Sequence, residues 1–392
     1  MPKAPLMSIS ARLAPHQRVF TAFAIYSFAL GNLFPRLPDI KRAMGIEEGA
    51  LGLALIGTST GTLIALTLAA PVIARLGHRQ ALFILLPLMS LCFAIAVHAT
   101  GPLALYFLLI PAGLTMGATE VIVNVEADRV EAALGRRIMN RAHAFWSFGF
   151  FAAGLFGAAM AQFGVPPTLH MALVLPIIFL GVRVLLADFQ PAPKRGTETA
   201  DAGPAIARPT KGIMVLVGVS LSAMLLEGAS IDWSAIYMRS VFDALPFLGG
   251  LAVATTALSQ AITRYFSDRI VDRHAPDRVA RAMQVAMALG VLVVFFAPSA
   301  LVALLGFALI GAGTAAIFPL AMSAAAQRSD RSAALNVAAL AQFSFVIFLL
   351  GPPLLGFVAE HAGLRWTFGL GLPLVAVSFV LSGALGSKPA RA

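Results

Sequence analysis

The sequence predicts an all-α integral membrane protein with twelve transmembrane helices in two six-helix bundles related by pseudo-symmetry. Three observations lead to this fold class. Of the 392 residues, 59% are hydrophobic and 12% are charged, and the mean hydropathy is +0.87, whereas soluble domains carry about 25% charged residues. The apolar residues are gathered in twelve runs, each of a length that can cross ~30 Å of hydrocarbon. One polar segment divides these runs into two sets of six.

Each apolar run is expected to form a helix, because only helices and closed barrels satisfy every backbone polar group in lipid. Barrel strands would alternate in polarity over about ten residues, and these runs do not. In chain order, the expected spans are 18–38, 48–70, 79–98, 102–126, 142–164, 167–187, 213–237, 245–263, 279–297, 299–323, 334–358 and 364–385.

The segment after the sixth run, DFQPAPKRGTETADAGPAIARPTK, is rich in Pro, Gly, Ala, Thr and charged residues. This composition is typical of a flexible linker. We therefore predict an N-terminal six-helix bundle over 1–187, a cytoplasmic linker over 188–212 and a C-terminal six-helix bundle over 213–392.

The two sets of runs share short echoes. The sequence IPAG at 110–113 in span four returns as IGAG at 310–313 in span ten. The pair Ser-Phe at 147–148 in span five returns at 344–345 in span eleven. Echoes at matching places on either side of one linker favour duplication. In parallel six-span repeats, the substrate site is expected near mid-membrane where the repeats meet.

The net charge of +10 does not indicate a nucleic-acid partner, because the basic residues lie in short loops and no zinc or helix-turn-helix spacing occurs. Most of the 28 lysines and arginines fall on the side of both termini. The positive-inside rule therefore predicts a multi-pass protein of the inner (plasma) membrane with both termini in the cytoplasm. The first residues, MPKAPLMSISARLAPHQR, are too polar for a cleaved signal peptide, so the first span is expected to act as an uncleaved signal.

Enzyme and metal motifs are missing from the sequence. It contains no His-Glu-x-x-His, no Gly-x4-Gly-Lys phosphate loop and no nucleophile elbow. The single cysteine, Cys92, lies in an apolar run and excludes intramolecular disulfides and a cysteine-rich metal site. We expect a protein that is not an enzyme and that uses no cofactor or metal.

Glu120 is the most informative residue, because it lies in the otherwise apolar run LALYFLLIPAGLTMGATEVIVNV. A charged side chain at mid-bilayer costs roughly 2.5–3.5 kcal/mol on insertion scales, and ionisable residues at that depth are usually functional. Asn124 follows at i+4 and shares its helix face. The expected role of Glu120 is proton or substrate handling. A structural acid that is hydrogen-bonded to a neighbouring helix is the alternative.

Parallel six-span repeats are the plan of the major facilitator transporters, and two loops resemble that superfamily's cytoplasmic signature, a small residue followed by Asp-Arg and a further basic residue. The loop after span eight, RYFSDRIVDR, carries Asp268 and Arg269. The resemblance implies a latch in which Asp268 caps or bridges a neighbouring helix end, and a plain basic anchor is the alternative. The loop after span two carries Arg75, but Ala74 stands where the acid is expected.

Three further stretches resemble the fucose-permease-like branch of this superfamily. Residues 117–124, GATEVIVN, fit its Gly-x-x-acid-x-x-x-Asn pattern. Residues 130–149, VEAALGRRIMNRAHAFWSFG, and residues 227–234, EGASIDWS, are similar to its uncharacterised bacterial permeases. The branch's characterised sugar symporter also carries an acid on span one, but residues 29–36 here read ALGNLFPR and contain no carboxylate. Glu120 is therefore the main candidate for proton coupling, with Glu227 second.

The expected substrate-binding residues are polar or aromatic side chains in or near the spans: Asn32, Asn124, Trp146, Trp233 and Gln342. Some of them could instead tie helices together, and Trp233 could be an interfacial anchor. His143 opens span five, where we expect a hydrogen bond to Glu126 or Asp128, with a proton relay to Glu120 as the alternative. Only Arg183 lies within a span, so we expect no close basic partner for Glu120.

These features predict a secondary transporter that moves a small polar, sugar-like solute by alternating access, coupled to protons through Glu120. Its expected partners are the small-molecule substrate, protons and the lipid bilayer, with no nucleic acid, and we expect a monomer. Proton-driven export of amphipathic, drug-like compounds is one alternative, since 28 Phe and 14 Met could line a drug pocket. A membrane sensor or scaffold without transport is the alternative from another class.

Overall fold

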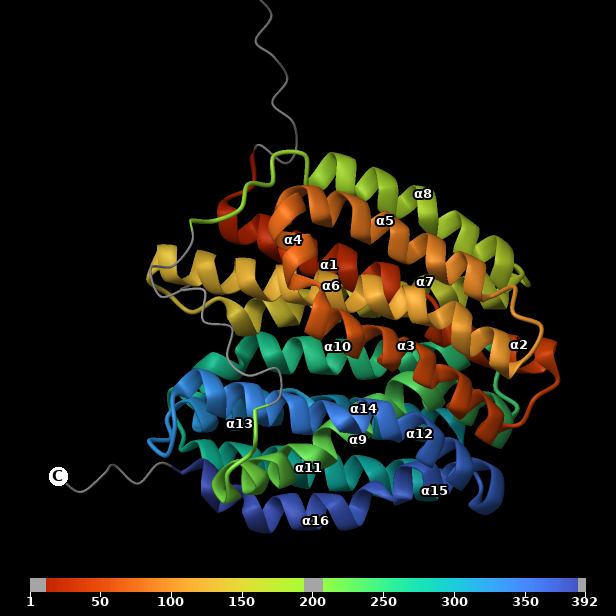
Figure 1. The fold of residues 1–392 in the computed structure, drawn as a ribbon. Helices are drawn as coiled ribbons and strands as arrows, with labels where there is room; N and C mark the ends of the chain where they lie inside the picture. Colours follow the sequence, from red (N-terminus) through yellow and green to blue (C-terminus); the bar gives the residue numbers. More distant parts are fainter. Residues whose placement is uncertain (1–11, 194–206, 387–392) are drawn as a thin grey trace, which may run out of the picture.

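The structure, a computed structural model, describes residues 12–193 and 207–386, and its described elements are all helical (Figure 1). The middle of the predicted linker, 194–206, lies outside the described residues. The elements of the first half are α1 Pro15–Gly31, η2 Phe34–Arg36, α2 Leu37–Met44, α3 Glu48–Leu68, α4 Ala70–Leu76, α5 His78–Ala96, α6 Pro102–Leu134, α7 Met139–Gln162 and α8 Pro167–Leu185.

The second half is built in the same way. Its elements are α9 Lys211–Phe242, α10 Pro246–Val271, α11 Pro276–Phe296, α12 Ala300–Thr314, α13 Ile317–Ala326, α14 Ala333–Ala362, α15 Leu364–Gly369, α16 Gly371–Leu381 and η3 Ser382–Leu385. Figure 1 shows the first half above and the second below, with long helices running roughly side by side.

Every predicted span contains a helix, which confirms the all-α membrane fold. Among the described residues, ten helical segments are long and apolar enough to cross a membrane. The other two predicted spans correspond to α1, which has 17 residues, and to α10, which is rich in Thr, Ser and Gln.

Several predicted boundaries were wrong because a helix does not stop where its apolar run stops. The first span was expected to reach residue 38 but ends at Gly31, and prolines start η2 and α2 beyond it. α6 continues to Leu134, where Gly135 takes a left-handed conformation with φ 63°. α10 continues to Val271, so the signature stretch that carries Asp268 is helical and not a loop. The tenth predicted span is broken between α12 and α13.

Alternating helix directions give the molecule two ends. One end, which we call the basic end, holds the start of α1, the α6–α7 and α10–α11 connections and the end of η3. The opposite end, which we call the far end, holds α2 and the α9–α10 connection. The basic end lies to the left in Figure 1 and the far end to the right.

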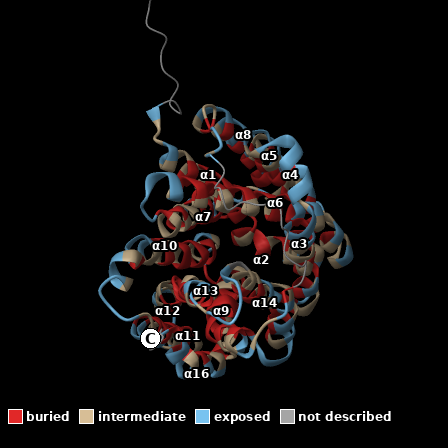
Figure 2. Cartoon of the chain, turned by 60° about the vertical axis from the view of Figure 1, so that its left-hand side comes forward, coloured by how far each residue is buried: buried red, intermediate tan, exposed pale blue. Residues whose placement is uncertain are grey.

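The two halves meet along two helix pairs, α7 with α10 and α3 with α14, and we call this surface the seam. Small residues bring the first pair close: a Cβ on Gly154 would lie 3.1 Å from Ala254, and one on Gly250 would lie 2.6 Å from Ala158. Figure 2 shows that the buried residues lie on the helix faces that meet inside the molecule.

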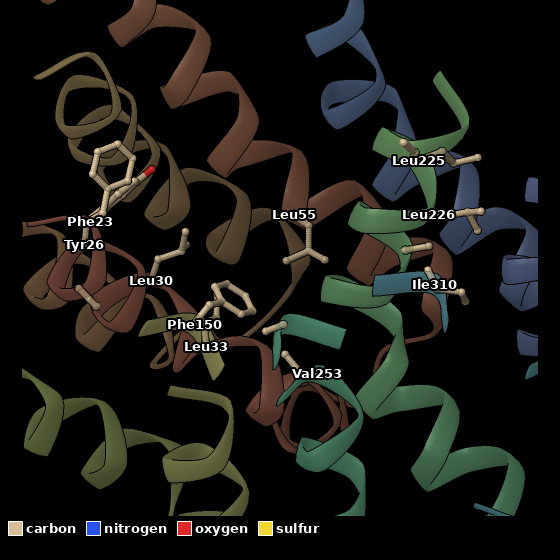
Figure 3. Packing of buried hydrophobic residues seen from close by; sticks show 14 of the residues in the cluster. Phe23, Tyr26, Leu30, Leu33, Leu55, Phe150, Leu225, Leu226, Val253 and Ile310 are labelled. Carbon is tan, nitrogen blue, oxygen red and sulfur yellow. The ribbon is translucent and has the colours of Figure 1, made fainter. Parts of the chain in front are cut away.

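Apolar side chains from both halves fill the interior next to the seam. Figure 3 shows Leu30, Leu33 and Phe150 of the first half close to Val253 of α10. All four are buried members of one hydrophobic cluster. The polar groups described next are therefore embedded in apolar packing.

Candidate functional site

Glu120 anchors a hydrogen-bonded group on the first half. Asn124 Nδ2 donates to the Glu120 carboxylate at 2.7 Å and to the Glu120 carbonyl oxygen at 2.9 Å. The Tyr26 hydroxyl on α1 is a further hydrogen-bond partner of this carboxylate. The one-turn spacing of Glu120 and Asn124 on α6 explains why the sequence pattern placed them on one face.

His143 belongs to the same group. Its Nε2 lies 3.2 Å from Asn124 Oδ1, and this contact requires Nε2 to carry the proton, because the amide oxygen only accepts. The expected hydrogen bond from His143 to Glu126 or Asp128 was therefore wrong. Asn124 joins His143 on α7 to Glu120 on α6, and α7 begins at the basic end.

Arg264 on α10 provides the charge at the seam. Its Nη2 lies 3.2 Å from Glu227 Oε1 on α9, and its Nη1 donates to Ser147 Oγ of α7 at 3.0 Å. Its Nε donates to the carbonyl oxygen of Ala315 at 3.1 Å. The exposed fractions are 13% for the Arg264 side chain and 18% for Glu227. One guanidinium thus joins both halves.

We expected no close basic partner for Glu120, and among the described side chains none forms an ion pair with it, but one arginine acts on it from α10. Arg264 is within electrostatic reach of both Glu120 and His143, although the ion pair that it forms is with Glu227. The predicted eighth span ended at 263, so Arg264 was assigned to a loop. Because α10 continues past it, the side chain turns inward instead.

A small pocket lies beside this ion pair, between α7, α9 and α10. Trp146 and Phe150 form its flat wall, with stacked rings whose centroids are 5.1 Å apart. Gln260 forms part of its polar edge, accepting from Ser147 Oγ at 3.2 Å and donating to Thr314 Oγ1 at 3.3 Å. The full lining is Trp146, Phe150, Glu227, Ser230, Ile231, Val253, Thr256, Ala257 and Gln260. The lining combines aromatic and polar groups, as ligand sites do, but the cavity volume is only about 10 Å³, roughly enough for one water molecule, so a solute would need the halves to separate.

Asn32, an expected substrate-binding residue, lies elsewhere. It is fully buried within the first half, where its Nδ2 donates to the Phe28 carbonyl oxygen at 2.6 Å. Its Oδ1 lies 3.0 Å from Nε2 of His170 on α8. Asn32 therefore ties α1 to α8 and does not face the pocket.

Trp233 and Gln342 also lie outside the lining of this pocket. Trp233 exposes 0% of its surface and packs against Gly356 of α14. Gln342 is exposed and accepts a hydrogen bond from the Ala207 backbone nitrogen at 3.0 Å. Trp233 thus belongs to the packing of α9 on α14, and Gln342 to a contact with the end of the linker.

The predicted latch residues lie at the basic end. Asp268 Oδ1 accepts a hydrogen bond from Asn140, the second residue of α7, and so bridges the second half to the start of a helix in the first. Arg269 is exposed and packs over the Phe266 ring. Arg75 is exposed at the end of α4. Of the three, only Asp268 contacts the opposite half in the interactions described.

Glu126 is a buried acid close to the loop after span two, where Ala74 stands in place of the signature aspartate. It is 1% exposed, pairs with His78 and lies 3.2 Å from Arg129 Nη1. Its second oxygen accepts from the Ala192 backbone nitrogen at 2.8 Å. The i,i+3 spacing of Glu126 and Arg129 could have predicted their contact from the sequence.

The far end carries a second contact between the halves that sequence reasoning missed. Asp39 of α2 lies 2.9 Å from Arg36 Nε and 3.2 Å from Nη1 of Arg239 on α9. Nearby, the Gly49 backbone nitrogen donates to Glu360 of α14 at 3.0 Å. The partners in the contacts between the halves, Asp39 with Arg239 and Gly49 with Glu360, are far apart in the chain, and no local motif marks these contacts.

Comparisons with known proteins agree with this architecture. A family model described as Major Facilitator Superfamily matches residues 215–391. The chain is 27% identical over 359 residues to an uncharacterised MFS-type transporter of Yersinia pestis, covering 90% of this chain and 91% of that protein.

Two solved structures share the fold. The nucleoside transporter NupG has a TM-score of 0.68 and 13% identity, covering 95% of this chain and 98% of its own. A variant of the E. coli fucose:proton symporter has a TM-score of 0.65 and 16% identity, covering 95% and 99%. At these identities the likeness concerns the fold alone.

Proposed function

We propose that this chain is a transporter of the major facilitator superfamily, in keeping with the family model over residues 215–391 and its MFS-type relatives, and on that premise that it is a proton-coupled secondary transporter of a small polar solute. The two halves, 1–187 and 213–392, would rock about the linker 188–212 and expose the site to each side in turn. We place it in the inner membrane with the basic end and both termini in the cytoplasm, in keeping with the positive-inside rule.

The observation that carries this proposal is the setting of Glu120. Its carboxylate has neutral hydrogen-bond partners, Asn124 and Tyr26, and no ion pair within 4 Å among the described side chains. A proton can therefore bind it without breaking a salt bridge. Glu227, by contrast, is neutralised by Arg264. Glu120 is the better proton acceptor of the two, with Glu227 second.

Protonation of Glu120 would change the charge of the seam. With Glu120 and Glu227 both ionised against Arg264, this group has a net charge of −1, and one proton brings it to zero. Burying a neutral group in a low-dielectric interior while the halves move costs far less free energy than burying a charged one. Asn124 and His143 extend from Glu120 towards the start of α7 and offer a hydrogen-bonded route for the proton from the basic end.

The pocket lining favours a polar solute. Trp146 and Phe150 provide a flat apolar wall, while Ser230, Thr256 and Gln260 provide hydroxyl and amide groups along the edge. Sugars and other polyhydroxylated rings present one apolar face and many hydroxyl groups, which suits such a lining. Export of amphipathic compounds remains the alternative function, but no methionine is among the residues that line this pocket.

The test is transport in proteoliposomes with and without a pH gradient, using a panel of sugars, polyols and sugar acids. We expect accumulation of at least one solute with the gradient, and alkalinisation outside when that solute is added. Glu120→Gln should abolish accumulation against a gradient but allow exchange at equal concentration. Glu47→Gln, the same charge change at a side chain that is 74% exposed, is the matched control.

Retention of gradient-driven accumulation by Glu120→Gln would show that Glu120 does not couple protons. Proton-driven efflux of cationic dyes, with no movement of any polar solute, would favour the exporter. If no solute in either class moves, the alternative of a non-transporting sensor or scaffold gains.

A further inference from the structure

We propose that Arg264 is the recognition site for a carboxylate group of the transported solute, and that Glu227 occupies this site when no solute is bound. The inference rests on the transport function proposed above and narrows its polar solute to a small organic acid, such as a sugar acid. It is argued from the donors of Arg264, from the charges around it and from its place beside the pocket.

The guanidinium is held in place by two neutral acceptors. Its Nε donates to the Ala315 carbonyl oxygen at 3.1 Å and its Nη1 to Ser147 Oγ at 3.0 Å. Its Nη2 is then directed at the Glu227 carboxylate, at 3.2 Å. Arginine presents its N–H groups in a planar fork that matches a carboxylate. The contact with Glu227 is the one that an incoming carboxylate can replace without disturbing the others.

Arg264 needs an anion, because its side chain is only 13% exposed in an apolar bundle. A buried charge that loses its partner is strongly destabilising. The neighbouring elements of the second half offer no substitute: α12 and α13 contain no charged residue, and α14 has none before Glu360 at the far end. A solute that displaced Glu227 with a hydroxyl alone would leave this charge unpaired.

The other titratable groups near Arg264 do not compete with Glu227 for the ion pair with it. Glu120 on α6 is engaged by Asn124 and Tyr26, and His143 on α7 is engaged by Asn124. Asp232 lies more than one turn beyond Glu227 on α9, and no ion pair between it and Arg264 is found among the described residues. Glu227 is thus the only carboxylate within ion-pair distance of Arg264 among the described residues.

Exchange of the two carboxylates requires a proton. When Glu227 binds a proton, it loses its charge and releases Nη2 of Arg264, and the solute's carboxylate takes its place. The proton and the anion enter together, so the charge of the site is unchanged. Glu227 lines the same pocket as Trp146 and Gln260, so a solute whose carboxylate meets Arg264 would place its body against the aromatic wall once the halves separate and the cavity widens.

The test compares matched pairs of probes that differ only in charge: galacturonate with galactose, gluconate with glucitol, and lactate with propane-1,2-diol. Binding is followed as the shift in melting temperature of the purified full chain. In Glu227→Gln no described carboxylate lies within ion-pair distance of Arg264, so we expect acids to bind at least about tenfold more tightly than their neutral counterparts. The wild type, in which Glu227 competes for Arg264, should bind the same acids more weakly than Glu227→Gln does.

Two variants of Arg264 complete the experiment. Arg264→Gln should lose the preference for acids, and Arg264→Lys should fold with the charge in place but bind more weakly, because lysine lacks the fork. Arg273→Gln, at an exposed loop position after α10, is the control and should keep the preference.

The inference is overturned if no acid stabilises Glu227→Gln more than its neutral counterpart, or if Arg264→Gln keeps the preference. Gradient-driven accumulation of a neutral sugar by the wild type would also overturn it, while leaving the proposed transport function in place. Conversely, if the protein binds acids selectively but transports nothing in proteoliposomes, the proposed transport function is wrong and the proposed anion site stands.

Discussion

Asn32 and Asn124 show how the surroundings of a side chain determine its role. Asn32 directly follows the last residue of α1, and Asn124 lies on α6. Asn32 is sealed within the first half against His170, whereas Asn124 bridges Glu120 and His143 beside the seam. The first contact joins two elements within the first half, and the second joins groups that we propose for proton transfer.

Substitution of these two residues should therefore have opposite effects. Asn32→Ala leaves a buried imidazole without its partner, which should lower stability by about 1–3 kcal/mol with little change in the substrate concentration for half-maximal transport. Asn124→Ala should change stability less and reduce proton-coupled accumulation. Thermal unfolding and proteoliposome uptake of both variants separate the two. Equal loss of uptake per folded molecule would contradict the assignment of Asn32.

Asp330, in the loop before α14, has an unusually acidic carboxyl group. Hydrogen bonds from Thr210, at 2.8 Å, and from Asn336, at 2.9 Å, stabilise the ionised form and lower its pKa to about 2. Thr210 caps the start of α9. The contact therefore fixes the end of the linker to the second half.

This shift predicts a pH effect on stability. Because the folded pKa is below the ordinary value of 3.8, the contribution of Asp330 is complete above that value and is lost as the pH falls towards about 2. Asp330→Asn should unfold at a lower temperature than the wild type near pH 6, and the difference should shrink through this window. Glu47→Gln is the control. A difference that stays constant with pH would contradict the origin of the effect.

Among the elements, the crossing of α3 and α6 depends most clearly on the absence of side chains. A Cβ on Gly61 would lie 2.1 Å from the Ile110 carbonyl oxygen, and one on Gly113 would lie 2.0 Å from that of Thr58. Glycines spaced in this way allow membrane helices to approach backbone to backbone. The IPAG sequence noted as a repeat is thus part of a packing surface.

Gly61→Ala should push α3 from α6 and cost about 1–3 kcal/mol, the usual range for overpacking. The matched control is Gly181→Ala on α8, where the nearest atom to a new Cβ is 3.9 Å away. That change should be neutral or slightly stabilising, because alanine favours a helix. Melting temperatures of the two variants provide the measurement, and equal values would argue against the close approach.

The sequence predicted the elements better than their limits. Hydropathy located each span because lipid exposure demands a continuous apolar run. It did not locate the ends of α6 and α10, since a helix can continue into polar sequence without a breaker. Gly135 ends α6 and Val271 ends α10. This error concealed Arg264, which a hydropathy boundary had placed outside the membrane.

The site was predictable only where its contacts are local. The pairing of Glu120 with Asn124 follows from one-turn spacing. The contact of Glu227 with Arg264 depends on how α9 and α10 are rotated about their axes, and periodicity in an almost wholly apolar helix does not define that rotation. The same reason explains why Trp233 is buried and Gln342 is exposed.

At the scale of the whole molecule, the two halves are joined at both ends by polar contacts. Asp268 and Asn140 join them at the basic end, and Asp39 and Arg239 at the far end. In an alternating transporter, contacts of this kind must open in turn. Their relative strength then sets the fraction of molecules that are open to each side.

Weakening the far-end contact should shift this balance. In a Cys92→Ser background, spin labels at Glu47 and Leu245, both exposed at the far end on opposite halves, report the distance between the halves. Asp39→Asn should increase the population with the longer distance. Asp243→Asn, at an exposed residue of the same end, is the control, and an unchanged distribution in Asp39→Asn would show that this pair does not hold the far end closed.

The interruption between α12 and α13 has a consequence for how the site is coupled to the fold. A broken helix leaves backbone carbonyl groups without their usual partners, and the one at Ala315 is satisfied by the guanidinium that also binds Glu227. The Arg264 side chain thus stabilises the break between α12 and α13 and also supplies the positive charge beside the pocket. If a solute binds Arg264, the backbone at the break between α12 and α13 should shift with it. Substitutions at this break should therefore change the affinity of the pocket for the solute.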